Sequence, residues 1–246
     1  TESLDSCRNA GEKVAAQMRI DIRLILNKLT FEKFDRLSDA FTEKVGTTLN
    51  HLRICVDEIC KGAQSQHSFC RMYATLCKTM VATQTSDTFH QLLVARCKEE
   101  FEVDMDEKLH QLAKYHKDLN QEDLDEKILV ARQAYTGHII FLGELHRTGC
   151  LSDGFVYDCI ESLFGEDEFK IACLCSLVEI VGRQLEQAMD MQTVKVNLQQ
   201  IVDNEHRSSR IRFMSQGVLE AWNDRDWNAR HQREKATTLA KLRTDE

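Results

Sequence analysis

Cysteine and histidine are the residue types in this chain best suited to metal binding or nucleophilic chemistry, and the 246 residues include ten cysteines and nine histidines. No C-x-x-C pair occurs, and no histidine pair has zinc-finger spacing. His138 and His146 would lie two turns apart on one helix, too far to share a metal without other ligands. Most cysteines fall in apolar periodic segments, where cysteine acts as a small buried hydrophobic residue. We therefore expect no metal or cofactor, and unpaired thiols in a reducing cytosol or nucleus.

Motifs that carry catalysis are missing as well. The sequence contains no phosphate-binding loop, no G-x-G-x-x-G, no H-E-x-x-H, no G-x-S-x-G and no calcium-binding loop. The sequence predicts a protein that is not an enzyme, an expectation that metal-dependent or thiol-dependent turnover would overturn.

Residues suited to binding are concentrated near the C-terminal end. In SSRIRFM, residues 208–214, Arg210 and Arg212 alternate with Ile211 and Phe213. Arginine beside an aromatic residue is typical of a protein-interface hot spot, although Phe213 could equally belong to a core. Further on, Trp222 and Trp227 are either anchors that fold the tail onto the preceding helices or contact residues.

Charge is distributed unevenly along the chain, whose formal net charge is −8. Residues 99–126 carry eleven acidic residues against three lysines. This stretch is either a solvated helix end with an exposed loop or a patch for a basic partner. Residues 206–243 carry nine Lys or Arg against four Asp or Glu, which permits a local phosphate-contacting stripe. The RNA-binding candidates are Arg207, Arg225, Arg230 and Arg233.

Helices must position these residues. Proline is absent and glycine is scarce, which argues against a protein built from tight β-turns. Apolar residues recur at helical spacing from end to end, as in Val14, Met18, Ile22, Ile25 and Leu29. Short breaks with Thr30, Thr47, Ser86 or Ser152 as helix N-caps separate these segments. No stretch approaches 18 consecutive apolar residues, so we expect no membrane span.

Ten helices in antiparallel pairs of about 40 residues predict an all-α fold, an α-solenoid of about five HEAT-type helix pairs. An irregular helical bundle is the alternative. We expect the repeat domain over residues 1–222, with repeats at roughly 8–44, 46–83, 86–148, 151–185 and 186–222. Residues 223–246 would form a basic C-terminal trailer.

Three strings together resemble a known family. ILNKLTFEKF (25–34), GHIIFLGEL (137–145) and SSRIRFM (208–214) are similar, in order and separation, to the middle domain of eukaryotic translation initiation factor 4G. Weaker similarity lies between and after them, in FCRMYATLC, LLVARCKEEFE, DWNAR and TLAKLR, so the resemblance covers nearly the whole chain.

The resemblance implies a cytoplasmic, non-catalytic HEAT-repeat scaffold. It implies binding to the DEAD-box RNA helicase initiation factor 4A, contact with both RecA-like lobes, stimulation of the helicase, and weaker RNA binding. One group of implied helicase contacts is Leu26, Leu29 and Phe34, which we expect to be exposed together at a turn. The second group is Phe141, Leu174, Arg210, Arg212 and Phe213. For each leucine or aromatic residue, a place in the solenoid core is the alternative.

The chain also departs from the family pattern. Phe31 and a position near His67 replace prolines, and Ile140 replaces a basic residue that would support an RNA contact. The cap-binding-protein motif is absent, so contact with a cap-binding protein would lie outside this chain. Two alternatives remain open: a related scaffold in mRNA decay, splicing or nuclear cap binding, and an RNA-binding module acting through the basic C-terminal region.

Overall fold

The computed structural model describes residues 2–83, 87–116 and 120–223, without the side chains of 2–11 and 83. Within these ranges the chain forms eleven α-helices and two short 3-10 helices, with no strand. The all-α prediction is therefore confirmed. The positions Ser86, Trp227, Arg225, Arg230 and Arg233, all named above, lie outside the described residues.

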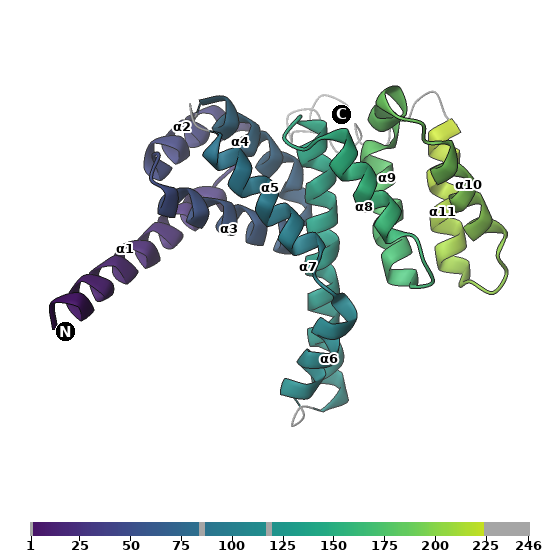
Figure 1. Ribbon diagram of the computed structural model, residues 1–246, viewed down its shortest axis with the longest axis horizontal. Coiled ribbons are helices and arrows are strands. Elements are labelled where there is room, and N and C mark those ends of the chain that lie inside the picture. Colours follow the sequence, from purple (N-terminus) through teal and green to yellow (C-terminus); the bar gives the residue numbers. More distant parts are fainter. Residues whose placement is uncertain (1, 84–86, 117–119, 224–246) are drawn as a thin grey trace, which may run out of the picture. The chain divides into compact units, whose positions relative to one another are not determined.

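The chain divides into two compact units, residues 1–159 and 160–246 (Figure 1). The first unit contains α1 (Glu2–Leu26), α2 (Phe34–Val45), α3 (Leu49–Ser65), α4 (Cys70–Thr83), α5 (Thr88–Phe101), α6 (Met105–Tyr115) and α7 (Gln121–Arg147). Its 3-10 helices are Phe31–Lys33 and His67–Phe69. Helix α8 (Asp153–Leu163) spans the division, and the second unit contains α9 (Glu168–Ala188), α10 (Gln192–Asp203) and α11 (Ser209–Asn223).

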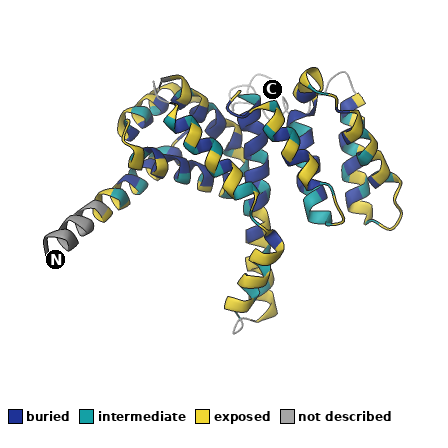
Figure 2. Ribbon diagram, viewed as in Figure 1, coloured by how far each residue is buried: buried dark blue, intermediate teal, exposed yellow. Residues whose placement is uncertain are grey.

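Helix α3 lies at the centre of the first unit, where it packs against α1, α5 and α7. Its buried residues Leu52, Val56, Ile59 and Ala63 recur every three or four positions, so one stripe of the helix faces the core. Among the described side chains of helix α1, residues 12–26, the buried ones begin at Met18, and Val14 is exposed although the periodicity placed it on the core face. Figure 2 shows this change from exposed to buried along α1.

The acidic stretch adds a helix that the periodicity did not predict. The predicted third repeat, residues 86–148, contains α5, α6 and α7 rather than two helices. Helix α6 begins at Met105 because the carboxylate of Asp104 accepts hydrogen bonds from the backbone N–H groups of Asp106 and Glu107. Asn120 caps α7 in the same way through Asp123.

Among the predicted N-caps, Ser152 is confirmed, since its Oγ accepts a hydrogen bond from the backbone N–H of Phe155 at 3.3 Å. Thr30 precedes a 3-10 helix without a side-chain cap bond. The residue at the N-cap of α3 is Thr48 rather than Thr47, and it makes no side-chain cap bond.

Candidate functional site

The start of α11 is held in place by a carboxylate of α9. Ser208 donates two hydrogen bonds to Glu168, from its backbone N–H at 2.8 Å and from its hydroxyl at 2.7 Å. The same hydroxyl oxygen accepts from the backbone N–H of Ile211 at 3.4 Å. The backbone bond and then the side-chain bond from Ser208 lower the pKa of Glu168, so the carboxylate stays ionised and fixes the first turn of α11.

Two of the arginines predicted to contact partners are used inside the second unit. Arg207 donates to the backbone carbonyls of Glu166 at 2.9 Å and Gly165 at 2.8 Å, and it pairs with the Glu166 carboxylate at 3.1 Å. Its side chain is only 10% exposed. Arg212 donates from Nε to the carbonyl of Val202 at 2.9 Å. The guanidinium groups of both residues therefore join loops and helices of this unit, and the RNA contact of Arg207 and the helicase contact of Arg212 stay predictions.

Phe213 and Arg210 remain on the solvent side of α11. Phe213 is 69% exposed, and Arg210, one turn earlier on the same face, is also exposed. The opposite face of α11 buries Ile211, Val218 and Trp222. The choice between core and surface, open from the sequence, is thus decided for Phe213, which is an exposed aromatic residue on an ordered helix.

Trp222 is an anchor rather than a contact residue. Its indole N–H donates to Glu186 at 2.9 Å, and the ammonium of Lys195 lies 4.7 Å from the ring centroid. The hydrogen bond from Lys195, with a smaller contribution from Trp222, lowers the pKa of Glu186 against the opposing effect of burial. The end of α11 is therefore tied to both α9 and α10.

The first predicted contact group lies in the other unit, and the expectation that it is exposed together is wrong for its two leucines. Leu26 and Leu29 are 3% and 1% exposed. Helix α1 ends at Leu26, and the next turn, in which the backbone N–H of Leu29 bonds to the carbonyl of Leu26, directs Leu29 back into the core. Phe34 is partly exposed, and Phe31 beside it is 70% exposed.

Phe141 in α7 and Leu174 in α9 are fully buried. The alternative interpretation, a place in the core, therefore describes Leu26, Leu29, Phe141 and Leu174. Phe34, Arg210 and Phe213 keep side-chain surface that a partner can reach.

A buried carboxylate that sequence reasoning missed, Glu58, joins α3 to α1 in the first unit. The side chain of Glu58 in α3 is 1% exposed and accepts hydrogen bonds from Arg19 at 3.0 Å and from Arg23 at 3.2 Å, both in α1. Burial alone would raise the pKa of Glu58, but the bonds from Arg23 and Arg19 outweigh it and lower the pKa. Next to it, Asp57 pairs with Arg96 of α5 at 3.6 Å.

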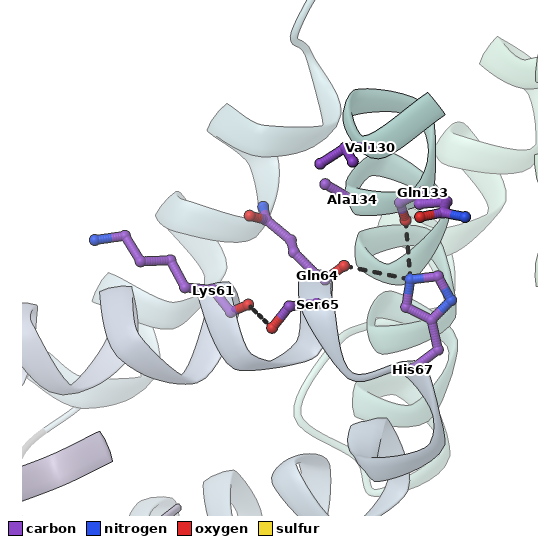
Figure 3. Close-up of a pocket in the computed structure, with 7 residues that line it drawn as sticks. All are labelled: Lys61, Gln64, Ser65, His67, Val130, Gln133 and Ala134. Atoms are coloured by element: carbon purple, nitrogen blue, oxygen red, sulfur yellow. Dashed lines mark hydrogen bonds between the residues drawn. The ribbon is translucent and has the colours of Figure 1, made fainter. Parts of the chain in front are cut away.

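Helices α3 and α7 meet at Gly137, beside a hollow of about 660 Å³ (Figure 3). His67 hydrogen-bonds through Nε2 with the carbonyl of Gln133 at 2.9 Å and that of Gln64 at 3.3 Å. A Cβ at position 137 would lie 2.5 Å from the His67 ring and 2.7 Å from the carbonyl oxygen of Ala63. Only glycine therefore permits this approach. Figure 3 shows Val130 and Ala134 on α7 and Gln64 near the end of α3, all of which line the hollow.

The cysteines and histidines form no metal centre within the described residues. All nine cysteines whose side chains are described are buried, and none forms a disulfide. Burial raises the pKa of the Cys70 and Cys159 thiols to about 12, so they are protonated at neutral pH. His138 is buried, which lowers its pKa, and bonds to the carbonyl of Cys97 at 3.0 Å. His146 bonds instead to Asp153 at 2.7 Å.

Comparison with known proteins decides the family. Residues 21–224 match the MIF4G domain family. The chain belongs to this family. The resemblance noted in the sequence is thereby confirmed, and the matched residues of the MIF4G domain include all helices from α2 to α11.

Relatives of this MIF4G domain are named as translation initiation factors. The mouse eukaryotic translation initiation factor 4 gamma 1 is 32% identical over 222 residues, covering 81% of this chain and 14% of the relative. The human eukaryotic translation initiation factor 4 gamma 3 is 31% identical over 221 residues, covering 81% of this chain and 14% of the relative. The factor 4 gamma of Dictyostelium discoideum is 30% identical and covers 89% of this chain and 19% of the relative. The chain thus spans less than a fifth of the length of these relatives.

A solved structure shows the same fold. The MIF4G domain of the Trypanosoma cruzi translation initiation factor EIF4G5 superimposes with a TM-score of 0.53 at 15% identity, covering 83% of this chain and 94% of that one. The likeness supports the α-solenoid prediction at the level of the fold. Among the described helices, none combines the length and apolar character needed to cross a bilayer.

Proposed function

We propose that this MIF4G domain is a non-catalytic scaffold of translation initiation that binds the DEAD-box RNA helicase initiation factor 4A. Membership of the family and the names of the relatives support a role in translation initiation. The observation that carries the contact site is Phe213, an exposed aromatic side chain one turn from Arg210 on a helix fixed at both ends.

This arrangement has the properties of an interface hot spot. Burial of a phenylalanine contributes about 1.5–3 kcal/mol, and arginine and aromatic residues dominate such sites. Because Glu168 and Trp222 fix α11 before binding, little conformational entropy is lost on association. The buried Leu174 of α9 supports this unit from inside.

The second contact is proposed at the turn between α1 and α2. Here Phe34 offers the reachable surface, and the exposed Phe31 extends it. Leu26 and Leu29 act by holding the turn in shape from the core, and Phe141 supports the same unit through α7. The contact residues that we propose at this turn are therefore Phe34 and Phe31 rather than Leu26 and Leu29.

Stimulation of the helicase is expected if the scaffold binds one arrangement of the two helicase lobes with higher affinity than the others. A scaffold that binds one lobe arrangement better than the others raises its population by the ratio of the affinities. No catalytic group of the scaffold is required for this effect.

The test is the dissociation constant for initiation factor 4A, measured by calorimetry for wild type and for Phe213→Ala. Loss of a hot-spot side chain is expected to weaken binding about 30-fold, which corresponds to about 2 kcal/mol. Val196→Ala, an exposed apolar position on α10 of the same unit, is the matched control and should bind normally. Unchanged binding by Phe213→Ala would refute the contact site, and binding only to a different helicase would favour a scaffold of mRNA decay or splicing.

RNA binding is proposed as the weaker activity of residues 223–246, which include Arg225, Arg230 and Arg233. Arg207 is no longer part of this proposal, because its guanidinium is bound inside the fold. Deletion of residues 224–246 is expected to remove RNA binding in a filter-binding assay and to leave helicase binding intact. Loss of both would show that the trailer also serves the helicase contact.

A further inference from the structure

His138 is a buried histidine of α7 that uses only one of its two ring nitrogens for bonding within the fold. The residue is 1% exposed, and its Nε2 lies 3.0 Å from the backbone carbonyl oxygen of Cys97 in α5. Because a carbonyl oxygen can only accept, Nε2 carries the proton of the neutral ring. The other nitrogen, Nδ1, is also buried and has no hydrogen-bond partner among the residues that the structure describes. A second proton on the ring would therefore lie on Nδ1, where none of these residues accepts its hydrogen bond.

The groups around His138 do not compensate for a charge on the ring. Burial is the largest effect and lowers the pKa of His138 below the ordinary 6.5, and the bond to Cys97 and the charge of Glu100 oppose it without outweighing it. Arg96, on α5 like Glu100 and paired with it, adds to the lowering. Further titratable groups on the elements packed around this part of α7 are His67, Cys60, Cys70, Cys77 and Cys159. Burial keeps the Cys70, Cys77 and Cys159 thiols protonated by raising their pKa, so they supply no negative charge.

The bond from His138 is part of the contact that holds α7 against α5 (Figure 1). Tyr135 donates from its hydroxyl to the carbonyl of Phe101 at 3.3 Å, one turn from the bond between His138 and Cys97. Residues 135 and 138 are three positions apart and so lie on one face of α7. A charged imidazole requires an acceptor or water at Nδ1, so protonation favours a form in which the ring leaves this contact and its bond to α5 is lost.

We propose that His138 is a pH-sensitive switch in the first unit, whose protonation releases α7 from α5. The closed form binds fewer protons than an open form in which the histidine is solvated and has its ordinary pKa of about 6.5. The closed form is therefore fully stable above this pH and loses stability as the pH falls below it. This range lies above the one in which Glu58 responds, because the pKa of Glu58 is below 4.5. The switch does not depend on the proposed helicase contacts.

Hydrogen exchange of the full chain, measured by mass spectrometry at pH 7.0 and 5.5 and corrected for the intrinsic effect of pH, tests the switch. The opening constant of the amides near residue 138 of α7 should rise about eightfold at the lower pH in wild type, since the open form takes up one proton. His138→Gln keeps an N–H donor for the Cys97 carbonyl but cannot be protonated, and it should lose this rise. His110→Gln, which removes an exposed histidine of α6, is the matched control and should respond as wild type does.

A second measurement needs no variant at position 138. In nitrogen NMR spectra of wild type with labelled histidine, the ring of His138 should stay neutral, with its proton on Nε2, from pH 7.0 to 5.5. The proposal is overturned if this ring becomes protonated at pH 6.5 or above while α7 stays closed. It is also overturned if His138→Gln shows the same rise in opening as wild type, or if the amides of α9 in the second unit open as much as those of α7. If His138→Gln does not fold, the ring titration and the exchange of wild type still decide.

Discussion

Gly137 is the residue at which α7 comes closest to α3. Replacement by alanine would place a methyl group 2.7 Å from the backbone oxygen of Ala63, which cannot move as a flexible side chain could. Overpacking of this kind costs about 1–3 kcal/mol. Gly137→Ala should therefore lower the free energy of unfolding of the first unit by about 2 kcal/mol in urea titrations. Gly154→Ala, where a Cβ meets nothing within 4 Å, is the control and should not destabilise the protein.

Glu58 gives the first unit a dependence on pH. Because its pKa is lower in the folded state than the ordinary 4.5, the ionised form stabilises the fold above this pH, and the stabilisation is lost as the pH falls below it. Glu58→Gln should cost about 2 kcal/mol at pH 7, since hydrogen bonds to charged groups contribute about 1.5–3 kcal/mol. The comparison uses urea unfolding of both proteins at pH 7 and pH 3.5. An equal difference between them at the two pH values would contradict this role.

Two arginines at the start of α11 differ in their surroundings. Arg207, just before the helix, is bonded within the fold, whereas Arg210 in its first turn is exposed. Arg207→Ala removes bonds to two carbonyls and a carboxylate and should lower the melting temperature of the second unit, with a loss of about 1–2 kcal/mol. Arg210→Ala should leave the melting temperature unchanged and weaken helicase binding. Thermal unfolding monitored by tryptophan fluorescence, together with the binding constant, distinguishes the two variants. Equal melting temperatures for both variants would refute the role of Arg207.

The helices were predictable from the sequence, but their exact faces were not. Apolar spacing predicts that Leu29 and Phe213 belong to helical segments or their ends, yet it cannot tell which of them packs. Leu29 is buried by the turn after α1, whereas Phe213 lies opposite the buried face of α11. The contact of Gly137 with His67 joins residues 70 positions apart, which no local pattern contains. A glycine within a helical pattern, such as Gly137 at the start of GHIIFLGEL, indicates a close approach of the backbone to another element, but it does not indicate which element.

Caps explain the missed helix. Asp104 and Asn120 begin α6 and α7 within a stretch whose composition is that of one charged segment. Met105, Leu109 and Leu112 do recur at helical spacing within it, but so short a period is hard to separate from the acidic residues around it. The acidic character of α6 and α7 was recognised from composition. The exposure of Val130 in α7 required the structure, since valine is the residue type of buried positions elsewhere in the chain.

Each of the two units carries one of the proposed helicase contacts. Phe34 and Phe31 serve the first unit, and Phe213 with Arg210 serves the second. A scaffold with two contacts can favour one arrangement of a two-lobed helicase, because both contacts are satisfied together in that arrangement only. Leu29→Asp would place a carboxylate in the core and is expected to unfold the first unit, so this variant cannot test a contact at the turn after α1.

Energy transfer between two fluorophores, one on each lobe of initiation factor 4A, reports the distance between the lobes while this chain is added, and it tests the proposed scaffold function. We predict that energy transfer changes to a saturable new value with wild type and with Val196→Ala, and that Phe213→Ala requires about 30-fold more protein to reach it. Saturated binding that leaves the lobe distance unchanged, or an equal titration with Phe213→Ala, would contradict the account.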